Sequence, residues 1–456
     1  MTTVSQELAR FSAEISADDF DDETIETAKE LVLDTLGCSM GAYSSPPVKA
    51  LRNAYLDRSG GSEATVIGRS ATTAVENAAL INAGMARYLD YNDCYMANTA
   101  ACHPSDHIMP LLSIAETTGA TGMELIEAIV TAYEVQGKGL DECPVRVNGF
   151  DYAAWGVYSS VAAAGKLLGL SEEEFVDAIG IAGASNNPLY ISRRGDVSMW
   201  KGIAHPYVSH NAIQACQMAR EGLSGPTEVF EGPFGFFEVV SDGEINFANP
   251  PGPGDHRILE TSLKSFACGY YIHSPVTGAL DILESHSIDS SDIESVHVEM
   301  FDVAVEALAT PEKWNKDLTR ETADHSIPYT VAAAIVDGAV TPTQYTEPRL
   351  RDGEIHEMMD RITVAENESL TAHREDHPRH IPSITTIEVD GETYEQRIDS
   401  PLGHPERPMT DEQVIQKFTD NCTPLLTQAQ IDQSIGHCRE LDALETVDPI
   451  VESVVV

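Results

Sequence analysis

Residues 74–115 of the chain read AVENAALINAGMARYLDYNDCYMANTAACHPSDHIMPLLSIA: an alanine-rich segment, a polar segment and an apolar run. The alanine-rich part, 74–89, has its small and apolar side chains at helical spacing, which predicts a helix that its neighbours approach closely. Similar Ala- and Gly-rich composition returns in 155–168 and 172–184. So many alanines favour a bundle of helices over a sheet face, and we expect a mainly α fold.

The polar part of this stretch carries titratable side chains where an ordinary loop would carry Gly, Ser and Lys. They are Asp90, Asp93, Cys94, Cys102, His103, Asp106 and His107. The apolar run 108–114 follows directly and is expected to be deeply buried. Titratable groups held against a buried element are typical of sites of proton transfer, so this segment is our first candidate for chemistry.

Further helices are expected on both sides of this stretch. The periodicity predicts helices over 22–40, 74–89, 112–135 with a break at 118–121, 155–168, 172–184 and 210–221. Acidic residues at the start of 22–40 suit the helix dipole. A Gly-Ser turn is expected at 59–62.

The pattern changes near residue 260. Ser295–Val303 alternates like a strand, and Thr385–Val389 and Tyr394–Ile398 flank Asp390-Gly391, a strong hairpin signal. Helices are expected between them, over 322–337 and 355–362, and again after the Pro-rich joint 403–408, over 410–421 and 427–444. We therefore expect an all-helical large domain, 1–262 plus 405–456, with a smaller α+β lid domain, 263–404, inserted into it.

The charge balance excludes several classes of partner. The 456 residues include 73 acidic and 28 basic side chains, a net charge of −45. Nucleic acids and anionic membranes both need a basic face, so neither is an expected partner. The acidic, lysine-poor composition suggests a protein from a halophile, whose cytoplasm screens the repulsion. The N-terminus lacks the basic and apolar regions of a signal peptide, and we expect a cytoplasmic protein.

Eight cysteines are scattered without a CxxC pair, at Cys38, Cys94, Cys102, Cys143, Cys216, Cys268, Cys422 and Cys438. Their spacing fits neither a disulfide framework nor a structural zinc site. A nucleophilic Cys94 or Cys102 is an alternative, but scattered cysteines more often serve as small buried apolar residues.

Four basic residues stand out because they lie in Gly-, Pro- and aromatic-rich loops and not on helix faces. They are Arg193, Arg194, Lys201 and Lys264. Such cations beside titratable Asp and His are what a small polycarboxylate requires, since Arg can bind a carboxylate through two hydrogen bonds. The alternative is that they pair with the protein's own abundant carboxylates.

His103 is the candidate base, because Pro104 fixes the turn that carries it between polar and buried segments. The alternative is a histidine that merely satisfies hydrogen bonds in a turn. A metal site built from His103, His107, Asp90, Asp93 and Cys94 is less favoured, because no familiar ligand spacing is present. No GxSxG, GxxxxGK[ST], HExxH or GxGxxG motif occurs, and we expect no cofactor.

The segment LDYNDCYMANTAACHPSD, 89–106, resembles the "DFDDT…HPS" signature of the MmgE/PrpD family of 2-methylcitrate dehydratases, cis-aconitate decarboxylases and iminodisuccinate epimerases. The resemblance runs along nearly the whole chain. In the family's order it includes ETAKELVLDTLGCSMGA (26–42), VNGFDYAAWGVYSSVAAAGKLLGL (147–170), SMWKG (198–202), GPFGFFEV (232–239), LKSFACGYYIHSP (263–275), DHSIPYTVA (324–332) and GHPERPM (403–409).

The resemblance implies a homodimer whose site lies between an all-helical domain and an α+β lid, with metal-independent elimination or decarboxylation. It implies catalytic or substrate-orienting roles for Asp90 and His103. Lys201 and Lys264 would neutralise carboxylates, His273 would be the acid or base on the lid side, and Tyr329 looks like the lid tyrosine. The chain departs from the family where Thr is replaced by Cys94 and where the central His is replaced by Tyr152 or Phe150.

We therefore expect a carbon–oxygen lyase that dehydrates a 2-methylcitrate-like tricarboxylate. His103 or Asp90 would remove the proton alpha to a carboxylate, and His273 or Tyr329 would assist the departing hydroxyl. The substrate-binding residues would be Cys94, Arg193, Arg194, Lys201 and Lys264. The alternatives are a decarboxylase or epimerase acting on a cis-aconitate- or iminodisuccinate-type acid, or a catalytically silent paralogue that binds a polycarboxylate.

Overall fold

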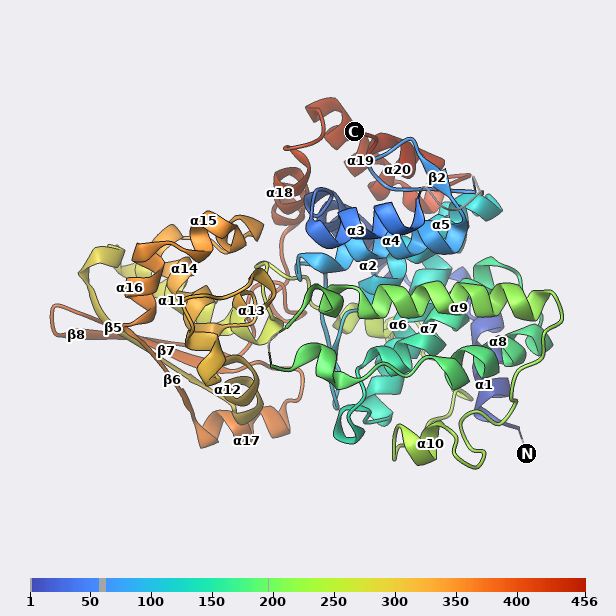
Figure 1. Ribbon diagram of the computed structural model, residues 1–456, viewed down its shortest axis with the longest axis horizontal. Helices are drawn as coiled ribbons and strands as arrows, with labels where there is room; N and C mark the ends of the chain where they lie inside the picture. Colours follow the sequence, from blue (N-terminus) through green and yellow to red (C-terminus); the bar gives the residue numbers. More distant parts are fainter. Residues whose placement is uncertain (1, 57–62, 196) are drawn as a thin grey trace.

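The structure, a computed structural model, describes residues 2–56, 63–195 and 197–456 (Figure 1). Most described elements are helices, and the mainly α fold is confirmed. The Gly-Ser turn expected at 59–62 lies outside the described residues. Figure 1 shows the α-helices from the first half of the chain gathered at one end of the molecule and the four-stranded sheet with its helices at the other.

In the described residues, the helical end begins with ten α-helices in chain order. They are α1 (Val4–Glu14), α2 (Asp22–Gly41), α3 (Pro46–Tyr55), α4 (Val75–Tyr88), α5 (Ile108–Thr118), α6 (Gly122–Glu142), α7 (Ala153–Leu167), α8 (Glu172–Ser185), α9 (Ala204–Arg220) and α10 (Phe236–Val239). Two short hairpins join them, β1 (Ala64–Thr65) with β2 (Thr72–Thr73) and β3 (Tyr95–Met96) with β4 (Ala101–Cys102).

Helices α6, α7 and α9 form the centre of this end, with α7 packed between the other two. Small residues permit this close packing: a Cβ added at Gly139 of α6 would lie 1.7 Å from the indole of Trp155 on α7. The same indole donates a hydrogen bond of 2.7 Å to the carbonyl of Val135. The alanine-rich composition therefore marks helices in close contact, as the sequence predicts.

The other end holds a four-stranded sheet in the order β6-β5-β7-β8. Its strands are β5 (Ile293–Met300), β6 (Ile362–Glu366), β7 (Ser383–Val389) and β8 (Glu392–Ile398), and its helices are α11 (His273–His286), α12 (Asp302–Leu308), α13 (Arg320–Ala323), α14 (Ile327–Asp337), α15 (Glu347–Leu350), α16 (Gly353–Met359) and α17 (Glu368–Asp376). β5 pairs with β6 in parallel and with β7 antiparallel, and α11 packs against β7 and β8.

The predicted hairpin is confirmed: β7 and β8 flank Asp390 and Gly391, whose φ angles of 51° and 76° are those of a tight hairpin turn. Two other predictions need correction. The strand that begins near residue 295 ends at Met300, and residues from Asp302 form α12. The helix expected over 322–337 is broken between α13 and α14, and β6 was not predicted.

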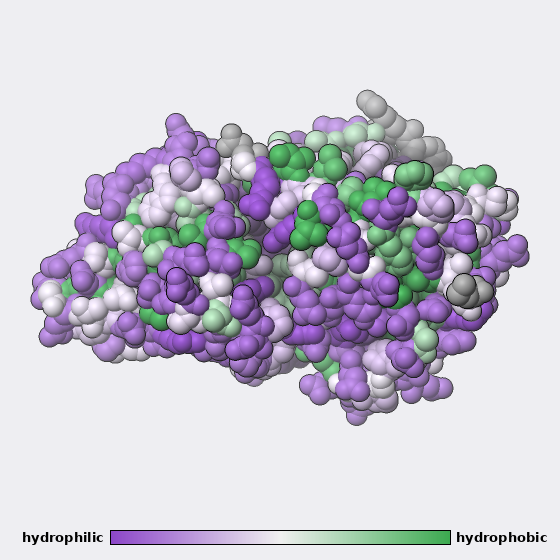
Figure 2. All heavy atoms as spheres, turned by 90° about the horizontal axis from the view of Figure 1, so that it is seen from below, coloured by the Kyte–Doolittle hydropathy of each residue, from purple (hydrophilic) through white to green (hydrophobic). Residues whose placement is uncertain are grey.

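The chain returns to the helical end through α18 (Asp411–Cys422), α19 (Gln428–Arg439) and α20 (Asp448–Ser453), and both α18 and α19 pack against α2. Lys417 of α18 lies 2.6 Å from the carboxylate of Asp34 on α2. The predicted domain limits and the role of 263–404 as a lid stay predictions. Among the described helices, none has both the length and the apolar character needed to cross a bilayer. Figure 2 shows one face of the molecule, which is mostly hydrophilic with small, separate hydrophobic groups.

Candidate active site

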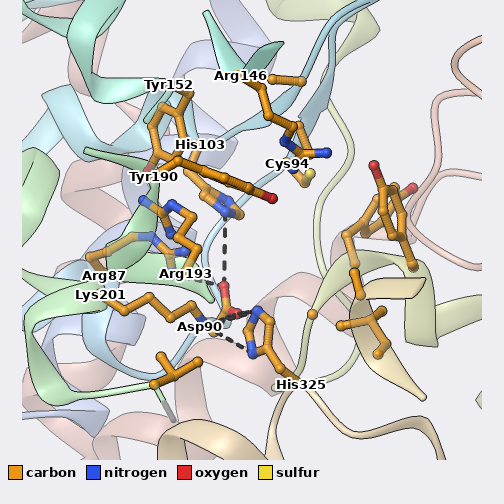
Figure 3. Close-up of a pocket in the computed structure, with 18 of the residues that line it drawn as sticks. Arg87, Asp90, Cys94, His103, Arg146, Tyr152, Tyr190, Arg193, Lys201 and His325 are labelled. Atoms are coloured by element: carbon orange, nitrogen blue, oxygen red, sulfur yellow. Dashed lines mark hydrogen bonds and ion pairs between the residues drawn. The ribbon is translucent and has the colours of Figure 1, made fainter. Parts of the chain in front are cut away.

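A pocket lies where the helical end meets the end that carries the sheet (Figure 3). The helical end contributes Asp90, His103 and Lys201 to its wall, and the other end contributes Tyr271 and His325. Among the described lining side chains, six are basic and one is acidic: Arg87, Arg146, Arg193, Lys201, Lys264 and Lys313, against Asp90. This excess of cations in a protein of net charge −45 indicates a site for an anion.

Asp90 projects from the C-terminal end of α4. Its φ of 52° places it in the left-handed region, where Asp is tolerated better than most residues. Its backbone N–H donates to the carbonyl of Arg87 (3.2 Å), which closes the turn after the helix. Backbone conformations of this kind are concentrated at functional sites.

The β3–β4 hairpin brings His103 next to Asp93. Tyr95 faces Cys102 across the ladder, so the residues just outside the pair, Cys94 and His103, emerge side by side. Cys94 also exchanges two backbone hydrogen bonds of 2.8 Å with Ser262, which ties the hairpin to the segment that carries Lys264. Two segments that are distant in sequence thus meet at one wall of the pocket.

Three cations surround the Asp90 carboxylate. Arg87 Nη1 and Lys264 Nζ each lie 2.7 Å from Oδ1, and Lys201 Nζ lies 3.0 Å from Oδ2. Burial alone would raise the pKa of Asp90, but Arg87, Lys201 and Lys264 together hold it well below its ordinary value. The carboxylate is therefore ionised and weakly basic, which suits it to hold cations in place better than to accept a proton.

His103 has the geometry of a base. Its Nδ1 lies 2.6 Å from the carbonyl oxygen of Asp93. A carbonyl can only accept, so Nδ1 carries the proton and Nε2 keeps a free lone pair. Nε2 lies 3.9 Å from Asp90 Oδ1 at the pocket wall, too far for a hydrogen bond. Burial, aided by Arg87 and Lys264, holds the pKa of His103 well below its ordinary value, so the imidazole is neutral.

Lys201 and His325 form the opposite side of the Asp90 cluster. Lys201 Nζ lies 2.8 Å from the ring nitrogens of His325, whose Nδ1 lies 2.5 Å from Asp324 Oδ1. Burial lowers the pKa of Lys201 to about 8, although Asp324 and Asp90 act in the opposite direction. Burial and Lys201 lower the pKa of His325 to about 4. Lys201 can therefore release a proton far more readily than an exposed lysine.

A metal ion has one candidate position among the described residues. Donor atoms of Asp90, Asp324 and His325 lie within 4.8 Å of one another. The ammonium of Lys201 lies within hydrogen-bond distance of two of these residues, so a cation of the protein already occupies this position. Of the metal ligands weighed from the sequence, this group shares only Asp90.

The other predicted binding residues differ in position. Arg193 lines the pocket, forms an ion pair with Asp151 and lies 4.6 Å from the centre of the Tyr152 ring. Arg194 is exposed, does not line the pocket and lies over the ring of Tyr190. Cys94 lines the pocket, and burial raises the pKa of its thiol to about 12, which leaves it unsuited as a nucleophile.

The remaining polar residues of the HPSDH turn hold the loop in place. Asp93 accepts a hydrogen bond of 2.6 Å from Ser105 and one of 2.7 Å from Tyr133. Asp106 accepts a hydrogen bond of 2.7 Å from Tyr152, which braces this turn. His107 contacts Ser159 and Gln136 away from the pocket.

His273 and Tyr329 do not line the pocket, against our expectation. His273 is fully buried at the start of α11 and packs against the rings of Phe266 and Tyr270. The Tyr329 hydroxyl donates to the carbonyl of Gln344 at 2.6 Å. The sheet-bearing end presents His325 to Asp90, because the chain breaks between α13 and α14; His325 Nε2 lies 3.1 Å from Asp90 Oδ2.

Sequence reasoning missed Arg87, His325 and Asp324. Arg87 lies in the predicted helix 74–89 and was not singled out, yet it is only 1% exposed. His325 lay inside a segment predicted as one helix. Ser326 followed by Pro328 is the available signal, since Ser caps helices and Pro favours their first turn; Ser326 accepts from the N–H of Tyr329.

The fold and site define an enzyme-like anion pocket, with a neutral imidazole beside a buried cluster of cations. The model of the MmgE/PrpD N-terminal domain matches residues 6–248, and that of the MmgE/PrpD C-terminal domain matches residues 266–441. The chain belongs to the MmgE/PrpD family, and it is a lyase. The second match extends past residue 404 into the helices that pack on α2.

Relatives cover most of the chain. A 2-methylcitrate dehydratase of Escherichia coli (strain K12) is 26% identical over 84% of this chain and 82% of its own length. A 2-methylcitrate dehydratase of Salmonella typhi is 26% identical over 91% of this chain and 90% of its own length. A cis-aconitate decarboxylase of Aspergillus terreus is 22% identical over 98% and 95%.

Proposed function

We propose that this lyase dehydrates a 2-methylcitrate-like tricarboxylate. The observation that carries the proposal is the Nδ1–Asp93 contact of His103, which leaves a neutral Nε2 with a free lone pair in a pocket of excess positive charge. Removing a proton from a carbon next to a carboxylate requires a base that accepts the proton and cations that stabilise the negative charge that then develops.

In the first half of the reaction, His103 Nε2 takes the proton from the carbon alpha to a substrate carboxylate. The electron pair left behind is delocalised into that carboxylate, which gains negative charge. Lys201 and Lys264 stabilise this charge, since both ammonium groups line the pocket beside Asp90. Asp90 holds the cations at fixed positions before the substrate arrives.

In the second half, the electron pair forms the carbon–carbon double bond and the bond to the hydroxyl breaks. Lys201 supplies the proton that turns the departing hydroxide into water. A pKa of about 8 leaves Lys201 largely protonated at neutral pH and still able to donate. Exchange with solvent then returns the proton from His103 and restores Lys201. This assignment replaces His273 and Tyr329 as the candidate acids.

The relative from Aspergillus terreus favours decarboxylation of a cis-aconitate-type acid as a second candidate, because it matches 98% of this chain. In that reaction the bond to a carboxylate breaks, carbon dioxide leaves and a protonated side chain delivers a proton to carbon. The buried apolar lining residues Cys94, Val197 and Leu308 suit such a step, since a less polar environment weakens the solvation of the departing carboxylate.

A substrate panel separates the two reactions. The purified chain is incubated in concentrated KCl with 2-methylcitrate, citrate, cis-aconitate and iminodisuccinate, and NMR follows each acid. We expect an unsaturated tricarboxylate and water from 2-methylcitrate, without release of carbon dioxide. Carbon dioxide from cis-aconitate with no loss of water from 2-methylcitrate would establish the second candidate. Racemisation alone would indicate an epimerase, and binding without turnover a silent paralogue.

A further inference from the structure

Arg146 lies at one end of the pocket, away from the Asp90 cluster. It belongs to a 3₁₀ turn, Arg146–Asn148, and lines the same pocket as Lys201 and His325. Figure 3 shows Arg146 beyond His103, on the opposite side of the view from His325. The pocket therefore has a cation at each end, with the candidate base between them.

Within the described part of the chain, no carboxylate neutralises the charge of Arg146. Arg87, Lys201 and Lys264 bind Asp90, and Arg193 binds Asp151. No carboxylate of the described residues lies within 4.0 Å of the Arg146 guanidinium, whose one described partner is the ring of Tyr190 at 4.8 Å. A half-buried guanidinium with a free hydrogen-bonding edge is a binding group for a carboxylate.

The position of Arg146 is fixed by its surroundings. The backbone N–H of Tyr190 donates to the carbonyl of Gly149 (2.9 Å), and that of Asp151 donates to the carbonyl of Pro188 (2.9 Å). These bonds hold the Arg146 turn against the segment that carries Tyr190. A guanidinium held over an aromatic ring loses less conformational entropy on binding a ligand than a free side chain would.

We propose that Arg146 binds the substrate carboxylate that lies farthest from the reacting carbon, and that it thereby selects tricarboxylates over dicarboxylates. This inference rests on the proposed function, because it assumes that a polycarboxylate occupies the pocket. Lys201 and Lys264 bind the carboxylate next to the carbon that loses its proton. Arg146 is reached only by a ligand long enough to place a second carboxylate at the other end of the pocket. Tyr190 keeps the guanidinium directed along the pocket.

Arg194 provides a matched control. Its guanidinium lies over the same Tyr190 ring, at 5.1 Å, yet it does not line the pocket. Replacing either arginine by methionine removes one positive charge and one contact with Tyr190. Only the Arg146 substitution removes a charge from the pocket wall, so the two variants separate a direct contact from a general electrostatic effect.

The test measures binding of citrate and of citramalate, in which a methyl group replaces one carboxymethyl arm, by calorimetry in a His103→Gln background that prevents turnover. We expect Arg146→Met to weaken the binding of citrate about 10- to 100-fold, which is the range of a hydrogen bond to a charged group. The affinity for citramalate should change less than about threefold. Arg194→Met should leave both within about threefold, and Arg146→Lys should retain part of the selectivity.

Three results would overturn the inference. Unchanged citrate binding in Arg146→Met, or an equal loss for both acids, would remove Arg146 from the role while the proposed function stands. Failure of the protein with native Arg146 to bind either acid would instead reject the polycarboxylate site as a whole. Circular dichroism and the melting temperature of each variant confirm that the fold is kept.

Discussion

Lys264 binds Asp90 twice: its Nζ lies 2.7 Å from the carboxylate oxygen Oδ1 and 2.9 Å from the backbone carbonyl oxygen of the same residue. One ammonium thus holds both the charge of Asp90 and its left-handed backbone, and it does so from the segment that leads to the sheet-bearing end. Lys417 in turn donates to the carbonyl of Lys264 at 2.8 Å. The candidate site therefore also connects the helical end with the segment that leads to the sheet-bearing end.

Asp90→Asn should destabilise the protein strongly. It removes the buried carboxylate that Arg87, Lys201 and Lys264 share, a change that typically costs about 3–5 kcal/mol. Chemical denaturation measures the loss, and Asp360→Asn, which breaks the exposed pair with Lys316, should cost less than about 1 kcal/mol. Equal effects of the two substitutions would contradict the structural role of Asp90.

The Asp90 cluster also makes the stability of the fold depend on pH in acid. The pKa of Asp90 is held below its ordinary value, so its contribution to stability is present above that value and is lost as the pH falls through the pKa of the folded state. The stability difference between the native protein and Asp90→Asn should therefore not shrink as the pH falls through the neutral range, and should shrink only in strong acid. A difference that already shrinks near neutral pH would be incompatible with an ionised Asp90.

The pH dependence of kcat/KM should have a single descending limb near pH 8. Lys201 must carry a proton to act as the acid, and its pKa is lowered to about 8, so the rate falls as the pH rises through that value. His103 must be neutral, and its lowered pKa keeps it so at neutral and alkaline pH. A rate that keeps rising above pH 9 would argue against Lys201 as the acid.

His325→Gln should reduce kcat far more than His273→Gln. His325 contacts Lys201, Asp90 and Asp324 in the pocket, whereas His273 is buried outside it. We expect a loss of about 10²-fold or more for His325→Gln, the usual effect of disturbing groups that transfer protons, and less than about tenfold for His273→Gln. Melting temperatures identify any loss caused by unfolding. The reverse order would restore His273 as the residue of the sheet-bearing end that acts in the site.

The thiol of Cys94 should be unreactive in the folded protein. Burial raises its pKa to about 12, and all eight cysteines of the chain are buried. Iodoacetamide at pH 8 should therefore leave the activity unchanged, while the denatured protein should be modified at every cysteine. Cys94→Thr, which restores the residue typical of the family, should keep kcat within about tenfold, since the side chain lines the pocket without a chemical role. Rapid inactivation by the reagent would point to a nucleophilic cysteine.

Most of the fold could be predicted because alanine spacing, capping residues and the Asp-Gly turn are local signals. Helix α2 and the β7–β8 hairpin match their predictions closely. One of the exceptions lies in 322–337, where the helical periodicity hid the local signal of Ser326 and Pro328 for a new helix. The contacts of Asp324 and His325 with Lys201, which follow from this break, are tertiary and cannot be read from local sequence.

Part of the candidate site could also be predicted from local signals in the sequence. Asp90, His103, Lys201 and Lys264 stand out by unusual type in an unusual place, and all four line the pocket. Arg87 lies on a regular helix and gave no such signal. His273 was chosen from the order of motifs, which does not tell which histidine faces the site. Three-dimensional proximity, such as that of His325 to Asp90, decides it.

The most direct test of the account is single-variant kinetics of His103→Gln with 2-methylcitrate, combined with calorimetric binding. Glutamine fills a similar space but cannot accept the proton, so kcat should fall by about 10²- to 10⁴-fold. Binding should stay within about tenfold, because the cations around Asp90 and Arg146 remain. Exchange of the alpha proton with D₂O should be lost in parallel. A His103→Gln variant that is folded, binds 2-methylcitrate and retains kcat would contradict the assignment of His103 as the base.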